Sequence, residues 1–179
     1  MQNFFNRSSV PVFVAAIAVA AMPTAGHAQE LRATAGGGLE RTDSAPGTGA
    51  VDGFYYGIQL GADWDLGGVS AGVEAELGDS TAAGLLHGNR ARQGVFASAA
   101  VRLAVPLNDR LQVFVRGGYT YHEIAYTTGP AFKRGGYTVG GGAEIDLTRG
   151  LFLRGEYRFS NYGRSVRGQQ FLGGAGVRF

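Results

Sequence analysis

Hydrophobic residues alternate with small or charged residues over eight stretches of roughly ten residues each after position 29. In the last stretch, Phe171, Val177 and Phe179 share one face, and Arg178 lies on the other. A repeat of two residues is that of a β-strand, because successive side chains point to opposite faces. The pattern predicts strands at Glu30 to Arg41, Gly53 to Asp63, Val69 to Gly78, Gly94 to Val105, Leu111 to Glu123, Gly135 to Leu147, Leu151 to Phe159 and Gly168 to Phe179.

The links between these predicted strands alternate in length. Short links fall at 64–68, 106–110 and 148–150, and longer ones at 42–52, 79–93, 124–134 and 160–167. An up-and-down barrel in an outer membrane has short periplasmic turns and longer external loops. The sequence therefore predicts an all-β fold: an eight-stranded antiparallel up-and-down transmembrane β-barrel with both termini in the periplasm.

The predicted outward face is apolar and carries no charge, as at Leu60, Val73 and Val115. The depth of the aromatic residues is an independent test of the barrel. Trp64 and Phe179 fall at the turn end, and a larger set falls at the loop end: Phe54, Tyr56, Tyr119, Tyr121, Tyr137, Tyr157, Phe159 and Phe171. Strand propensity alone predicts no clustering by depth, whereas aromatic girdles at both interfaces are typical of membrane barrels.

The opposite face of the predicted strands collects the charged residues. An eight-stranded barrel is just wide enough for side chains to fill it, so these groups should pair across the lumen. Of the 16 basic residues 15 are arginine, whose planar guanidinium suits carboxylate pairing. We expect an interior ion-pair network of Arg102, Arg116, Arg154, Arg158, Glu74, Glu76, Glu144, Asp146 and Glu156, with Arg32, Arg178, Glu40 and Asp63 in the same phase.

Residues 1–28 have the pattern of a signal peptide. Arg7 supplies positive charge, Val10 to Met22 is apolar, and Gly26-His27-Ala28 offers small residues at both positions that signal peptidase inspects. Thirteen apolar residues are too few for a membrane-spanning helix, which needs about twenty. We expect cleavage after Ala28, which leaves residues 29–179 as the barrel domain.

Composition excludes several other settings. The chain has no cysteine, so no disulfide can support the fold. Loss of Arg7 with the signal peptide leaves 15 Lys and Arg against 14 Asp and Glu, and this near-neutral balance argues against a nucleic-acid partner. The glycine runs at 36–38 and 140–142 lack the strand-to-helix context of a phosphate-binding loop. We interpret them as relief of crowding inside the barrel.

Candidate catalytic groups have simpler structural interpretations. Glu74 with Glu76, and Glu144 with Asp146, project from one strand face about 7 Å apart and could form a metal or acid–base site. With six arginines in the same interior, salt bridges are the favoured interpretation. His122 is expected to be a satisfied interior histidine, and His87 has no second histidine or cysteine at ligand spacing. No cofactor, metal or catalytic residue is expected.

Taken together, the apparent signal peptide, the strand pattern, the charged interior and the terminal aromatic resemble the small eight-stranded outer-membrane barrels of the OmpA/OmpX and opacity-protein type. The resemblance covers Glu30 to Phe179. It implies that Phe179 is the assembly signal read by the barrel assembly machinery. The chain stops at the barrel and lacks the periplasmic peptidoglycan-binding domain of full-length OmpA, which places a cell-wall tether in doubt.

Four other classes of protein are alternatives to a structural barrel. A lipid A deacylase of the known family should show a His-x-Ser pair, but Ile124 stands two positions after His122. A palmitoyl transferase would need an apolar interior slot, and the charged interior argues against one. A soluble lipocalin-like barrel would place apolar residues inside. A small-solute pore remains open as an alternative.

The predicted external links are rich in arginine, so the outer rim could contact lipopolysaccharide phosphates. The candidates for this contact are Arg90, Arg92, Lys133, Arg134, Arg164 and Arg167. Ordinary solvated loop charge would give the same pattern. We conclude from the sequence that this is a monomeric integral outer-membrane protein of a Gram-negative envelope, with a structural or surface-interaction role and no catalysis. Its partners would be outer-membrane lipid, lipopolysaccharide and the barrel assembly machinery.

Overall fold

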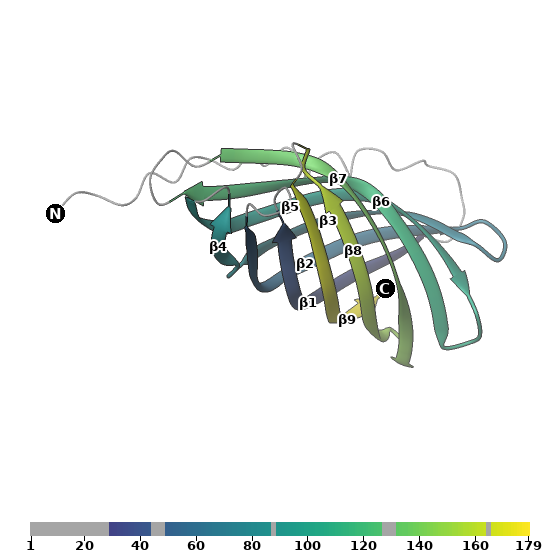
Figure 1. The fold of residues 1–179 in the computed structure, drawn as a ribbon. Helices are drawn as coiled ribbons and strands as arrows, with labels where there is room; N and C mark the ends of the chain where they lie inside the picture. Colours follow the sequence, from purple (N-terminus) through teal and green to yellow (C-terminus); the bar gives the residue numbers. More distant parts are fainter. Residues whose placement is uncertain (1–28, 44–48, 87–88, 127–131, 164–165) are drawn as a thin grey trace.

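The computed structural model describes residues 29–43, 49–86, 89–126, 132–163 and 166–179. The predicted signal peptide lies outside these residues. Antiparallel strands tilted along one axis make up the fold (Figure 1): β1 (Gln29–Asp43), β2 (Ala50–Asp65), β3 (Ser70–Ser80), β4 (Ala83–Leu86), β5 (Asn89–Pro106), β6 (Leu111–Tyr126), β7 (Phe132–Thr148), β8 (Leu151–Asn161) and β9 (Arg167–Arg178). Within the described residues, no helix is long and apolar enough to cross a membrane.

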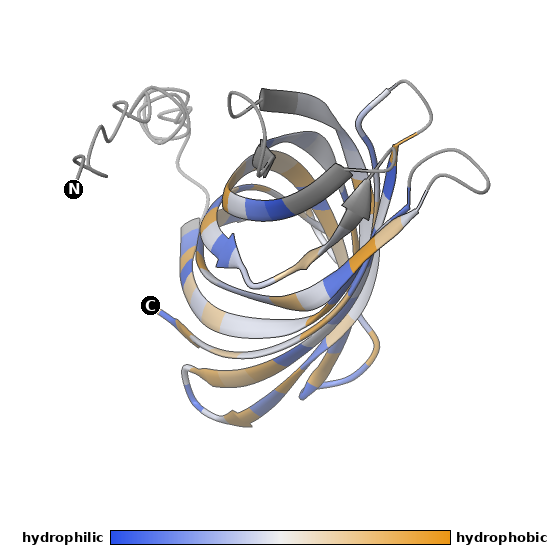
Figure 2. Cartoon of the chain, turned by 60° about the vertical axis from the view of Figure 1, so that its left-hand side comes forward, coloured by the Kyte–Doolittle hydropathy of each residue, from blue (hydrophilic) through white to orange (hydrophobic). Residues whose placement is uncertain are grey.

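The sheet closes on itself, which confirms the predicted fold class. Each long strand pairs with its neighbour in the chain, and β1 pairs with both β2 and β9 (Figure 2). At the seam, Leu31 and Phe179 exchange two backbone hydrogen bonds of 3.0 Å. Closure leaves no unpaired edge along the wall, so the backbone polar groups are satisfied inside the membrane.

The predicted long links are longer than the segments that separate the strands in the structure. The segment 79–93 contains β4, which pairs with both β2 and β5 beyond the end of β3, so β3 and β4 share one position in an eight-position wall. The other hairpins also continue outward, as in the pairing of Ile124 with Phe132. Strands of 16 to 18 residues exceed the roughly 9–11 residues that cross a bilayer. Paired strands satisfy their own backbone groups, so the ladder extends beyond the membrane.

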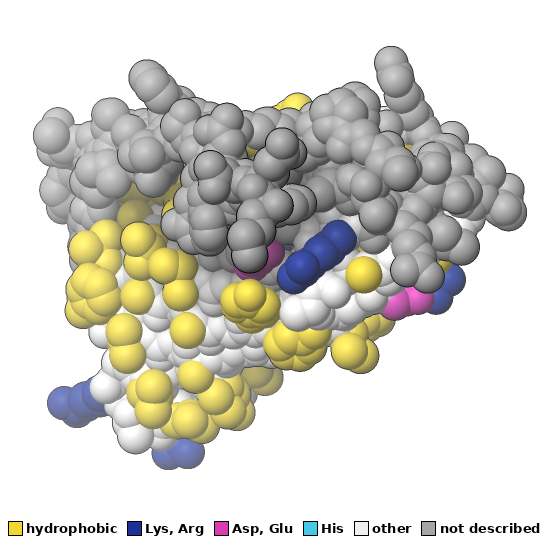
Figure 3. All heavy atoms as spheres, turned by 90° about the vertical axis from the view of Figure 1, so that its left-hand side faces the viewer, with side chains coloured by type: hydrophobic (Ala, Val, Ile, Leu, Met, Phe, Trp, Pro, Cys, Tyr) yellow, Lys and Arg dark blue, Asp and Glu magenta, His cyan; other side chains and the backbone are white. Residues whose placement is uncertain are grey.

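Side chains separate onto two faces as the alternation predicts. The outer wall exposes large apolar groups such as Ile58, Leu60 and Val101, and Figure 3 shows hydrophobic side chains gathered over the described part of one face. Aromatic residues lie next to one another across strands, with Tyr119 opposite Tyr137 and Tyr157 opposite Phe171. The wall is therefore apolar with an aromatic belt toward the external end, as a lipid-facing surface requires.

The glycine runs relieve crowding against the backbone of the neighbouring strand. A Cβ built on Gly38 would collide with the carbonyl oxygen of Phe171, and one on Gly142 would collide with that of Gly155. Glycine thus permits close strand approach in a small, strongly twisted barrel. Both positions lie in the inward phase, as the sequence interpretation of crowding inside the barrel expects, and at Gly142 the Phe114 ring also lies 2.9 Å from the added Cβ.

Candidate functional site

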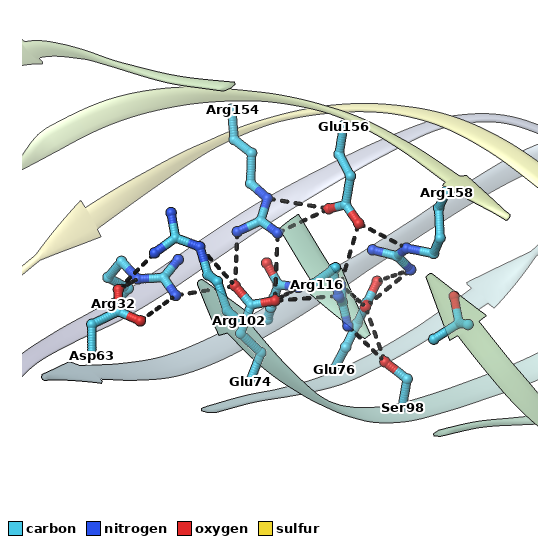
Figure 4. Close-up of polar contacts among 12 residues, drawn as sticks. Arg32, Asp63, Glu74, Glu76, Ser98, Arg102, Arg116, Arg154, Glu156 and Arg158 are labelled. Atoms are coloured by element: carbon cyan, nitrogen blue, oxygen red, sulfur yellow. Dashed lines mark hydrogen bonds and ion pairs between the residues drawn. The ribbon is translucent and has the colours of Figure 1, made fainter. Parts of the chain in front are cut away.

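A cluster of alternating charges fills the middle of the lumen, and we call it the central cluster. It contains five arginines and five carboxylates: Arg32, Arg102, Arg116, Arg154, Arg158, Asp63, Glu74, Glu76, Glu144 and Glu156. They point inward from β1, β2, β3, β5, β6, β7 and β8. Figure 4 shows how they face one another across the barrel. Each side chain is at most 7% exposed.

Glu74 lies at the middle of the cluster. The guanidinium groups of Arg154 and Arg32 lie 2.9 and 3.0 Å from its carboxylate. The guanidinium of Arg116 lies 3.3 Å away, and that of Arg102 lies 3.7 Å away. One buried anion is therefore shared by four cations, which holds strands from opposite sides of the barrel together. Such charges are tolerated in a barrel interior because each is paired.

A second set of contacts surrounds Arg158. Its guanidinium lies 3.0 Å from Glu76 and 2.9 Å from Glu156. The Tyr55 hydroxyl donates to Glu76 at 2.6 Å, and the Ser98 hydroxyl donates to the same carboxylate at 3.2 Å. Neutral donors thus complete the hydrogen bonding that the arginines leave unfilled.

Aromatic rings pack against arginine guanidinium groups at two places in the lumen. The guanidinium carbons of Arg154 and Arg102 lie 4.0 and 4.8 Å from the centre of the Phe114 ring. Arg178 lies 4.4 Å from the centre of the Phe152 ring. Sequence reasoning placed Arg32 and Asp63 in the inward phase whose charges should pair across the lumen. It assigned no role to these rings or to Tyr55. The inward phase of their strands was the signal that could have identified them.

Asp146 lies apart from the central cluster, at the inner mouth of the barrel. It is bound by Arg178, which also reaches Glu144 at 2.7 Å and Glu30 at 3.1 Å. This mouth opens as a vestibule of about 1250 Å³ lined by the short turns, including Asn108 and Arg149. Beside the central cluster, a cavity of about 40 Å³ lies against the glycine-rich wall. The cluster thus separates the vestibule from the outer part of the lumen.

The outer part of the lumen has a different character, and we call it the outer chamber. The name stands for a set of buried side chains and not for a cavity: Glu40, Gln93, Thr120, His122, Tyr162 and Gln170. The Glu40 Oε1 and His122 Nε2 atoms are 3.8 Å apart, too far for a hydrogen bond. Neither ring nitrogen of His122 has a hydrogen-bond partner among the described residues. The histidine is interior, but the expectation that it is satisfied is wrong.

Aromatic rings flank His122 on two sides. Tyr162 donates its backbone N–H to Val166, and the Tyr162 ring lies 5.5 Å from the His122 ring. Phe96 packs on the other side of His122 at 4.7 Å. Burial raises the pKa of the Tyr162 phenol, so this group stays neutral.

Of the external cations predicted from the sequence, the structure describes two side chains, Arg92 and Arg167, and both are exposed. The side chains of Arg90, Lys133 and Arg134 and the whole of Arg164 lie outside the described part. Phe179 projects outward at the inner rim, 71% exposed. In the described ranges, no group of three or more His, Cys, Asp or Glu side chains is placed to hold a metal ion.

A closed antiparallel barrel with an apolar, aromatic-belted wall and a charged interior defines an integral outer-membrane protein. The family model described as the outer membrane protein beta-barrel domain matches residues 12–179. The chain belongs to this family. It is one of the small eight-stranded outer-membrane barrels, and its place is the outer membrane of a Gram-negative envelope.

Outer-membrane proteins of Brucella have sequences similar to this chain. The 31 kDa outer-membrane immunogenic protein of Brucella melitensis is 26% identical over 150 residues, which cover 70% of this chain and 62% of that protein. The 25 kDa outer-membrane immunogenic protein of Brucella ovis is 28% identical over 139 residues, covering 76% of this chain and 69% of that protein. Both relatives are named as outer-membrane immunogenic proteins.

Solved structures share the fold. Ail, the attachment invasion locus protein of Yersinia pestis, solved with the heparin analogue sucrose octasulfate, superposes with a TM-score of 0.59 at 13% identity, over 84% of this chain and 99% of that one. Neisserial surface protein A superposes with a TM-score of 0.60 at 15% identity, over 84% of this chain and 97% of that one. At these identities the likeness concerns the fold alone.

Proposed function

We propose that this protein is a closed barrel that contributes to envelope structure and to surface interactions, without catalysis or bulk solute passage. The observation that supports this most directly is the central cluster, whose ten side chains interlock across the lumen. The roles of the barrel then belong to its lipid-facing wall and its external end. We further propose that residues 1–28 are removed after export, which mass spectrometry of the mature N-terminus tests.

Planar-bilayer recording tests the closed barrel. The unmodified protein should conduct poorly, because charged side chains occupy the width that water would need. Arg116→Ala removes a cation that bridges Glu74, Glu76 and Glu156, so its conductance should rise while its thermal stability falls. Large, stable, porin-like conductance from the unmodified protein would instead establish a pore.

The external end is proposed to bind anionic glycolipid or glycan. Support comes from the exposed Arg92 and Arg167, and from the binding of a sulfated sugar by Ail, a protein of the same fold. The double variant Arg92→Gln/Arg167→Gln should bind lipopolysaccharide more weakly in a nanodisc assay. The matched control is Arg110→Gln/Arg149→Gln, which removes two exposed arginines from the inner turns. Equal loss in both variants would assign binding to overall charge and not to the outer rim.

Phe179 is proposed to be the recognition signal for the barrel assembly machinery. Its side chain is free on the outer surface, where a partner could reach it. Deletion of Phe179 should lower the amount of folded protein in the outer membrane without changing export. The barrel is proposed to work as a monomer, and light scattering of the purified protein checks this. An unchanged surface yield after the deletion would remove Phe179 from this role.

A further inference from the structure

We propose that the external ends of β7, β8 and β9 bind the phosphate group of an outer-leaflet glycolipid on the outer wall of the barrel. The inference rests on the proposed binding of anionic glycolipid and assigns that binding to one side of the rim. Five side chains on the outward face form this site, which we call the rim patch: Tyr137, Tyr157, Asn161, Arg167 and Gln169.

The wall is low where the rim patch lies. β8 and β9 have 11 and 12 residues, whereas β5, β6 and β7 have 18, 16 and 17. Asn161 at the end of β8 pairs with Tyr137 of the aromatic belt on one side and with Arg167 at the start of β9 on the other. Because belt aromatics lie at the level of the lipid headgroups, the rim patch lies at that level too.

Hydrogen bonds within the rim patch occupy acceptors and leave donors free. The Tyr157 hydroxyl donates to Gln169 Oε1 at 3.2 Å, and the backbone N–H of Gly163 donates to Asn161 Oδ1 at 2.9 Å. Asn161 Nδ2 donates to the Tyr137 hydroxyl at 2.9 Å, so the hydroxyl proton of Tyr137 has no partner among the described residues. Asn161 keeps one amide N–H and Gln169 keeps two. A set of donors fits a group that only accepts, and an ionised phosphate is such a group.

Arg167 supplies the positive charge of the rim patch. It is exposed, and no carboxylate of the described residues is within ion-pair distance of it. Asp43 is opposite Arg167 in the backbone pairing, but its carboxylate is bound by Arg41 at 2.9 Å. Arg41 is also 3.5 Å from Asp52, so its charge is already compensated. A free guanidinium beside amide donors can bind a phosphate through two parallel hydrogen bonds.

Arg92, the other exposed arginine among the predicted external cations, lacks such neighbours. It lies on the part of β5 that pairs with β4, where the ladder extends beyond the membrane. Its partners across the two neighbouring strands are Ala83 and Ala125, which offer no side-chain donor. Arg92 therefore has the same charge at the same end of the barrel without a donor set, and it is the matched control for Arg167.

Native mass spectrometry of the purified protein in detergent, titrated with bisphosphorylated lipid A, tests the rim patch. The unmodified protein should bind one lipid A, and it should bind dephosphorylated lipid A at least about tenfold more weakly. Arg167→Gln should weaken binding of the phosphorylated lipid about tenfold, because charge-assisted hydrogen bonds are lost. Gln169→Glu should weaken it at least as much, because a carboxylate replaces two donors. Arg92→Gln should change it by less than about twofold. Heat-modifiable migration on a gel verifies that each variant is folded.

The outcomes separate the rim patch from the proposed glycolipid binding. Equal losses in Arg92→Gln and Arg167→Gln overturn the rim patch but keep the proposed binding, which overall rim charge would then determine. Equal binding of both lipids by the unmodified protein overturns phosphate recognition. No binding of either lipid overturns the rim patch and the proposed binding together. If a variant does not fold, photoreactive lipid A on the unmodified protein decides: label on β8 and β9 supports the site, and label confined to β3, β4 and β5 overturns it.

Discussion

Glu74 and Glu40 are both buried glutamates that point into the lumen, yet their surroundings are opposite. Glu74 is held by four arginines in the central cluster, whereas Glu40 in the outer chamber faces an unbonded histidine. Burial is the same in the two regions, and pairing is not. The comparison teaches that one barrel interior can combine a network of paired charges with a buried carboxylate that only neutral side chains contact.

The largest expected effect is a difference in the free energy of unfolding when each of the two glutamates is replaced by glutamine. Glu74→Gln removes the carboxylate that four arginines share. Because these cations stay buried, the substitution should lower the free energy of unfolding by about 3–5 kcal/mol. Glu40→Gln removes a carboxylate without a bound cation and should change it by less than about 1 kcal/mol. Urea unfolding in liposomes measures both. Equal losses would show that the two regions do not differ.

The second-largest effect is expected when a positive charge is placed on the lipid-facing wall instead of in the lumen. Val73 precedes Glu74 but points to the lipid, so Val73→Arg should cost roughly 2–4 kcal/mol at the membrane midplane. Ser70→Arg near the inner rim and Tyr121→Arg near the outer rim should cost much less. If all three variants have equal folding stability in liposomes, the assigned faces or depths are wrong.

A smaller effect concerns the ring beneath two arginines of the central cluster. A double-mutant cycle of Phe114→Leu with Arg154→Gln should give a coupling energy of about 0.5–2 kcal/mol, because the guanidinium lies over the ring. Phe96, which packs against His122, provides the control cycle with the same arginine. Coupling there as large as at Phe114 would argue that general repacking, and not the cation–ring contact, is measured.

The smallest effect is expected where a similar ion pair is open to water. Arg41 and Asp43 lie 2.9 Å apart on the exposed end of β1. Arg41→Gln should leave the unfolding midpoint unchanged within error, because solvent screens exposed pairs. A loss comparable to that at Glu74 would mean that geometry, and not burial, decides the strength of these pairs.

The sequence predicted the wall of the barrel well because alternation is a local signal. Each strand core was placed, and Leu60 outward with Asp63 inward follows directly from the period of two. The ends of the hairpins could not be placed in the same way. The backbone ladder continues past the bilayer where no change of polarity marks its end, so β4 was assigned to a loop.

The partners inside the lumen were beyond the sequence for a different reason. Arg154 meets Glu74 eighty residues earlier in the chain, and His122 meets Glu40 rather than any neighbour in sequence. Which inward residues share a level depends on the tilt and stagger of the closed sheet. The set of inward charges is therefore readable from the sequence, but its division into a paired cluster and an unpaired chamber is not.

The seam between β1 and β9 also constrains the order of events in biogenesis. Arg32 of β1 and Arg178 of β9 are opposite each other in the backbone pairing, although nearly the whole barrel sequence separates them. The barrel therefore cannot close until β9 has been synthesised. Any shorter N-terminal portion ends in an unpaired strand edge, which is prone to join other chains. Folding in stages during synthesis would expose that edge. The barrel must therefore be kept open and shielded until its last strand arrives, and ring closure is a single late step.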